Sequence, residues 1–127
     1  MKSHLLAGLV FGATLSVAHH SFIAEFDMNR PVRLEGTVTK LEFVNPHTQI
    51  YLEVQSPGGA STTWVIEAAS PNGLLRRGFT KSCLPQGTRV VIDAFESRTT
   101  SHKAAGRDLV APGGYTFLLG SFSEGVK

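Results

Sequence analysis

The sequence predicts an all-β domain that is mainly antiparallel and carries one short helix. Apolar and polar side chains alternate over short runs such as "TQIYLEVQ" (residues 48–55), and strict alternation over four to eight residues indicates a strand with one buried face. Clusters of Gly, Pro and Asn separate these runs and mark turns. One segment, residues 70–78, has the residues of a capped helix instead.

The first strand is predicted over residues 32–46, with an irregularity inside it. Apolar positions up to Val38 share one face, whereas Leu41 has the opposite parity. One extra residue near Thr39 would restore the pattern, and a single extra residue of this kind is a β-bulge. Gly36 lies inside the same strand, which indicates a tight bend.

The second and third strands are predicted as a hairpin. Residues 48–55 form the first arm, "SPGG" (residues 56–59) is the turn, and residues 61–68 form the second arm with Trp64 and Ile66 facing inward. Two alternating runs joined by a short Pro/Gly segment are typical of an antiparallel pair.

The helix is predicted to begin after Ser70, because Ser is a good N-cap and the next residue, Pro71, suits the first helical position. Gly78 can end the helix in the left-handed region. The segment gives about two turns, between the third and fourth strands.

The remaining chain predicts a fourth strand at residues 89–96 and a last hairpin within residues 107–121, around Pro112-Gly113-Gly114. Residues 97–108 are predicted to be one long polar loop. This order favours a small five-stranded, partly open barrel of the OB type, with one short helix between strands three and four. A small sandwich is the alternative architecture.

The first 18 residues have the pattern of a secretory signal peptide. Lys2 supplies the positive charge, residues 5–17 are apolar, and the small residues Ser16 and Ala18 precede a cleavage point. The apolar run is shorter than the ~20 residues that cross a bilayer. We therefore expect residues 19–127 to form a single domain in the periplasm or outside the cell, without a stable membrane anchor.

Composition and motifs exclude several function classes. The formal charge of +2 includes Lys2, so the mature chain is close to neutral, and export makes nucleic acid an unsuitable partner. The sequence has no G-x-S-x-G, no C-x-x-C, no H-E-x-x-H and no phosphate-binding glycine loop. The sequence therefore favours a binding function over catalysis.

Two kinds of residue are expected to have no chemical role. The single Cys83 is interpreted as a small, half-buried apolar residue. The carboxylates in the strands, Glu67 among them, are interpreted as exposed.

The histidines are the residues that suggest chemistry. Cleavage after Ala18 would give His19 a free α-amine beside its imidazole, and these two nitrogens can close a chelate ring on one cation. His47, which follows Asn45-Pro46, is the expected third nitrogen ligand, with His20 as a second choice. A nitrogen-rich set of this kind, often called a histidine brace, favours copper, and zinc is also possible. Glu25 or Asp27 would be outer or occasional ligands.

A second interpretation involves no metal. The adjacent histidines would be solvated, His47 would only cap its turn, and His102 would be a solvated loop residue. The protein would then be a periplasmic binding module for a peptide, a glycan or an envelope protein. On this interpretation Asn45, Asn72, Arg76 and Arg77 are ligand-binding or structural groups.

The motifs "AHHSFIAEFD", "EGTVTKLEFVNPH" and "SPNGLLRRGFT" resemble a family of small secreted bacterial proteins classed as a domain of unknown function. The resemblance implies a signal peptide, export to the periplasm and a compact β-rich domain, but no activity. The chain departs from the usual pattern at Phe79 and Cys83. The distinctive polar positions of the family fall on His19, His20, Ser21, Asn45, Pro46, His47, Pro71, Asn72, Arg76 and Arg77.

Overall fold

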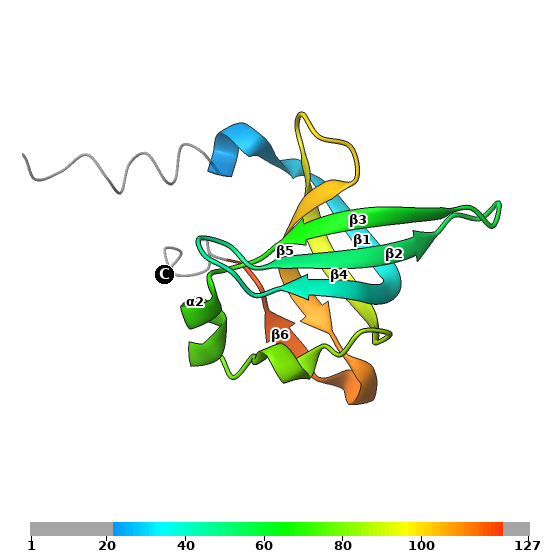
Figure 1. Ribbon diagram of the computed structural model, residues 1–127. Helices are drawn as coiled ribbons and strands as arrows, with labels where there is room; N and C mark the ends of the chain where they lie inside the picture. Colours follow the sequence, from blue (N-terminus) through cyan, green and yellow to red (C-terminus); the bar gives the residue numbers. More distant parts are fainter. Residues whose placement is uncertain (1–21, 121–127) are drawn as a thin grey trace, which may run out of the picture.

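A long first strand, β1 (Phe26–Glu42), organises the sheet in the computed structural model of the protein, which describes residues 22–120 (Figure 1). The second half of β1 pairs with β2 (Gln49–Gln55), and the first half pairs with β4 (Arg89–Ser97). On its other edge, β2 pairs with β3 (Ser61–Glu67). One strand therefore belongs to both halves of the sheet, which curls around it.

The sheet closes where β3 meets β5 (Lys103–Val110). β5 pairs with β4 in antiparallel fashion and with β3 in parallel, through Val65↔Lys103, Ile66↔Ala104 and Glu67↔Ala105. The order β1-β2-β3-β5-β4 is thus a ring whose closing seam is only three residue pairs long. The prediction of an all-β, mainly antiparallel fold is confirmed, and the sheet forms a partly closed ring.

A sixth short strand, β6 (Thr116–Leu118), extends this ring. It pairs with β5 after a 3₁₀ turn, η2 (Pro112–Gly114), so the hairpin predicted around Pro112-Gly113-Gly114 is present. The strand count among the described residues is therefore six, with five in the ring. No helix in this part of the chain is long and apolar enough to cross a membrane.

The predicted bulge and bend in the first strand are both present. The register of β1 against β2 shifts between Val38 and Lys40, which leaves Thr39 as the extra residue. At Gly36 the two strands approach so closely that a Cβ atom would lie 2.4 Å from the carbonyl oxygen of Glu53. The strand begins earlier than predicted, at Phe26, because β4 continues to pair with it as far as Ser97.

The predicted helix is α2 (Pro71–Arg76), followed by a 3₁₀ turn, η1 (Lys81–Cys83). The Ser70 hydroxyl accepts a hydrogen bond from the Gly73 amide at 3.2 Å, and Gly78 has a φ of 79°. Both features are those expected of an N-cap and of a left-handed helix end. Leu74 is fully buried, so the helix covers one end of the barrel.

The predicted loop at residues 97–108 is wrong beyond residue 102, because β5 begins at Lys103. Ala104, Ala105 and Gly106 are all buried, and a Cβ on Gly106 would lie within 2.8 Å of Leu119 and 2.9 Å of Ile66. A strand that is covered on both faces needs small residues here, so it shows no alternation. Because apolar and polar residues do not alternate in this segment, the sequence pattern predicts a loop there instead of a strand.

The hairpin of β2 and β3 projects beyond the barrel at the end far from α2 (Figure 1). Its turn, residues 56–60, is exposed along its whole length. Neither Gly58 nor Gly59 has another group within 4 Å of the position of a Cβ atom. This turn therefore contributes nothing to the core.

Candidate functional site

His47 lies in the turn between β1 and β2, beside the cis Asn45-Pro46 peptide. The next residue fixes the turn to the sheet, because the Thr48 amide donates to the Ala69 carbonyl at 3.2 Å and the Thr48 carbonyl accepts from the Ala68 amide at 2.8 Å. Thr48 is fully buried. The backbone at His47 is thus anchored against the segment that leads from β3 into α2.

Glu67, the last residue of β3, orients the imidazole of His47. Nδ1 of His47 lies 2.6 Å from Oε1 of Glu67. The two groups form an ion pair when the imidazole is protonated. The contact is made through Nδ1, so Nε2 is the ring nitrogen outside it, and the His47 side chain as a whole is 42% exposed.

Glu67 is shared with Lys103, at the start of β5. Oε2 of Glu67 lies 3.6 Å from Nζ of Lys103, which also makes a close ion pair with Glu25. Partial burial would lower the pKa of Lys103, but the hydrogen bond to Glu25 and the charges of Glu25 and Glu67 outweigh it and raise this pKa. Lys103 is therefore positively charged, and it connects Glu25 to Glu67 where β3 pairs with β5.

The same seam holds the N-terminal turn, a helical turn at residues 22–25. The Arg98 amide donates to the Glu25 carbonyl at 2.7 Å, and Nε of Arg98 donates to the Ile23 carbonyl at 3.0 Å. Phe26 is buried, and its ring packs 5.3 Å from that of Phe22. A continuous chain of side chains, His47–Glu67–Lys103–Glu25, thus joins the β1–β2 turn to the N-terminal turn.

Replacing Lys103 with Met should loosen the N-terminal turn. The substitution leaves Glu25 and Glu67 without their shared cation, and breaking a partly buried pair of this kind costs about 1–2 kcal/mol, below the value for fully buried pairs. We expect amide hydrogen exchange of residues 22–27 to become about tenfold faster.

The matched control is Lys40→Met. Lys40 also forms an ion pair, with Glu42, but its side chain is 59% exposed, and exposed pairs contribute little. Equal exchange in the two variants would show that the Lys103 link does not hold the turn.

A pocket of about 200 Å³ lies beside His47, lined by Pro46, His47, Ala69, Ser70, Gly73, Arg76 and Arg77. Nη1 of Arg77 donates to the carbonyls of Leu118 and Gly120, at 3.1 and 2.8 Å. Arg77 therefore ties α2 to the end of β6 and to the residues after it. His47, predicted as a metal ligand, and Arg76 and Arg77, predicted as ligand-binding or structural groups, lie together at this pocket.

Other predicted site residues lie elsewhere. His19, His20 and Ser21 lie outside the described residues. Asn45 and Asn72 are exposed and do not line the pocket. Asp27 is paired with Arg98 at 3.2 Å. Within residues 22–120 no group of three or more His, Cys, Asp and Glu side chains could hold a metal ion.

Three positions have different surroundings from those expected. His102 is exposed, but its ring packs edge-on against Trp64, with the ring centroids 5.3 Å apart. Glu67 is only 17% exposed, so reading it as an exposed strand carboxylate is wrong. Nothing in the sequence around Lys103 marks it as a site residue. No local signal marks Glu67 or Lys103, because their proximity depends on the pairing of β3 with β5.

The chain belongs to a family of unknown function, DUF6152, whose model matches residues 7–106. The match includes His19 and His20 and runs through β4 into β5. No curated protein and no solved structure matches the chain. The family assigns no activity, so function has to be argued from the residues around His47.

Proposed function

We propose that this protein is exported, is cleaved before His19 and binds copper through its new N-terminus together with His47. The observation that carries the proposal is the 2.6 Å contact between Nδ1 of His47 and Glu67. Metal-binding histidines commonly donate their second ring nitrogen to a carboxylate, which fixes the tautomer and orients the ring. The contact of Glu67 with Nδ1 supports Nε2 as the nitrogen that would bind the metal.

The free N-terminus would supply the other two ligands. The α-amine and Nδ1 of an N-terminal histidine close a six-membered ring on a metal ion, and an amine with an ordinary pKa near 7.7–8.0 loses its proton at modest cost. Together with Nε2 of His47 they make a set of three nitrogens. Such a set suits Cu(II), whereas calcium and magnesium prefer oxygen ligands.

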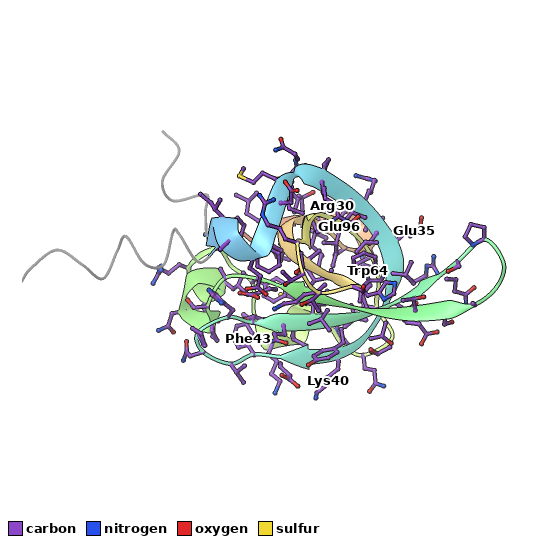
Figure 2. All side chains as sticks on the ribbon, turned by 90° about the horizontal axis from the view of Figure 1, so that it is seen from above. Arg30, Glu35, Lys40, Phe43, Trp64 and Glu96 are labelled. Carbon is purple, nitrogen blue, oxygen red and sulfur yellow. The ribbon has the colours of Figure 1, made fainter. Side chains whose placement is uncertain are left out.

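The short segment between His19 and the N-terminal turn limits how far the new N-terminus can extend. His19 is three residues before Phe22, and three residues span at most about 10 Å. Phe22 belongs to the N-terminal turn, which the side chains of Glu25, Lys103 and Glu67 connect to His47. In both views this turn and the turn between β1 and β2 lie at the same end of the barrel (Figures 1 and 2).

Mass spectrometry of the exported protein, purified without a tag, tests the proposal directly. Native spectra should give a chain that begins at His19 and carries one copper ion. If the spectra show one zinc ion in place of copper, the proposed ligands would stand and only the identity of the metal would change. A different first residue, or a protein without metal after exposure to stoichiometric Cu(II), would overturn the proposal.

Substitutions should separate the ligand from the residue that orients it. In the mature protein, His47→Ala removes a ligand and should weaken Cu(II) binding by at least about 100-fold. Glu67→Gln keeps the ligand and disturbs its orientation, and changes of this kind typically cost 10–100-fold in affinity. The measurement is competition with a chelator of known Cu(II) affinity.

The control is His102→Asn, which removes another exposed imidazole. Asn is suitable because His102 has a φ of 55°, and Asn tolerates this left-handed conformation. This variant should bind Cu(II) like the unchanged protein. Equal losses in His47→Ala and His102→Asn would mean that copper binds to surface histidines in general.

A second candidate function is recognition of a small anionic group without any metal. It is favoured by the pocket beside His47, whose rim includes Arg76 and Arg77. The carboxylate of a peptide or an acidic glycan would suit such a rim. Binding of a carboxylate probe that is lost in Arg76→Ala, in a protein that takes up no copper, would support this candidate over the first.

A further inference from the structure

A second pocket, larger than the one beside His47, lies beneath the turn between β4 and β5. Its volume is about 310 Å³, against about 200 Å³ at His47, and ligand pockets start at about 300 Å³. It is lined by Arg30 of β1, Trp64 of β3, the end of β4 and the turn at residues 98–102. None of the proposed copper ligands lines it, so it can be considered independently.

The charged groups of this pocket are already paired. Nη2 of Arg30 lies 2.6 Å from Glu96, and Figure 2 shows these two side chains together on the side of the barrel where Trp64 lies. Arg98 pairs with Asp27. The pocket therefore has no strong excess of either charge, and it does not select a phosphate or a carboxylate by charge.

The remaining lining combines aromatic rings with hydroxyl groups. Trp64 is partly buried, and His102 packs edge-on against it. Thr99, Thr100 and Ser101 also line the pocket. An indole offers an apolar face and a hydrogen-bond donor, while hydroxyls and a fixed Arg–Glu pair offer donors and acceptors in defined directions. These are the groups that a sugar ring requires, because it has both an apolar C–H face and a rim of hydroxyls.

A peptide strand is a poor match for the same place. Peptides often bind by adding a strand to a free sheet edge. Here β3 pairs with β2 through Leu52↔Trp64 and with β5 through Val65↔Lys103, and β4 pairs with both β1 and β5. Beside the pocket the backbone of β4 is therefore used on both sides, and the edge of β3 without a second strand partner among the described residues is limited to residues 61–64.

We propose that the pocket formed by Trp64, His102, Arg30, Glu96 and the β4–β5 turn binds a neutral saccharide. Trp64 stacks on one sugar ring, and the Arg30–Glu96 pair binds its hydroxyls. This binding is independent of copper and uses the side of the barrel that carries the β4–β5 turn.

Trp64 makes the test direct, because it is the only tryptophan in the chain. Metal-free protein is titrated with the trisaccharides of N-acetylglucosamine, glucose in β-linkage and glucose in α-linkage, and tryptophan emission is followed. A saturable change with at least one of them, with a Kd below about 1 mM, is the expected result. Inorganic phosphate and a neutral tripeptide are the comparison probes.

Two arginines provide a matched pair of variants. Arg30 pairs with Glu96 inside the pocket, and Arg33 pairs with Asp93 outside it, at 2.6 and 2.7 Å. Both side chains are more than half exposed, so neither substitution should unfold the protein. Arg30→Ala should weaken saccharide binding by about tenfold or more, and Arg33→Ala should leave it unchanged.

Three results would overturn the saccharide proposal. The first is that none of the trisaccharides changes the emission saturably. The second is that Arg33→Ala weakens binding as much as Arg30→Ala does. The third is that phosphate or the tripeptide binds and the sugars do not. Because all titrations use metal-free protein, failure of the copper proposal leaves the outcome unaffected.

Discussion

A protein that keeps one alanine ahead of His19 should bind Cu(II) at least about 100-fold more weakly than a protein that begins at His19. The added residue converts the α-amine of His19 into an amide. An amide nitrogen binds a metal only after it is deprotonated, which costs much more free energy than deprotonation of an amine. The chelate ring is lost with the amine, and only single imidazole nitrogens remain. A hundredfold loss corresponds to about 2.7 kcal/mol. Chelator competition on both proteins, prepared side by side, measures the difference.

The matched control adds the same residue elsewhere. An alanine inserted between Gly58 and Gly59, in the exposed turn between β2 and β3, should leave Cu(II) affinity unchanged in a protein that begins at His19. A second comparison is His20→Ala, which removes the alternative third ligand and should have a smaller effect than His47→Ala. If the extended protein binds as tightly as the one beginning at His19, the N-terminal amine is not a ligand.

Gly36→Ala should destabilise the barrel strongly. The added Cβ would lie 2.4 Å from the carbonyl oxygen of Glu53 and 2.9 Å from Cγ of Leu52. The first of these atoms belongs to the backbone of β2, so the strands themselves must move apart. We expect a loss of about 3 kcal/mol, which is at the upper end for added core atoms. For a domain of this size that lowers Tm by more than about 10 °C.

Gly58→Ala is the control for that substitution. Gly58 lies in the exposed turn between β2 and β3, and nothing lies within 4 Å of the place of its Cβ. Its stability should change by no more than about 0.5 kcal/mol, as for most surface substitutions. Thermal unfolding followed by circular dichroism compares the two variants. Similar Tm values for Gly36→Ala and Gly58→Ala would contradict the close approach of β1 and β2.

Local features of the fold could be predicted from the sequence because neighbouring residues determine them. The parity change after Val38 locates the bulge, since side chains alternate strictly along a strand. Ser70, Pro71 and Gly78 predict both ends of α2, since the caps involve residues within one turn of it. The order of strands and helix then favours a barrel over a sandwich.

The features that could not be predicted depend on pairing between distant segments. β5 has the small residues Ala104, Ala105 and Gly106 because both of its faces are covered, and a strand of this kind has no alternation to detect. Likewise, Glu67 meets Lys103 only because β3 and β5 close the ring. Its contact with His47 instead follows from the β2–β3 hairpin, in which Glu67 pairs with Gln49.

The projecting turn at residues 56–60 has a practical consequence for every experiment described above. A conventional affinity tag at the N-terminus would itself occupy the amine of the proposed copper site. The projecting turn is exposed and makes no core contact, and in Figure 1 it points away from the N-terminal turn. A short purification epitope or a fluorophore can be engineered there, which leaves the N-terminal amine unmodified.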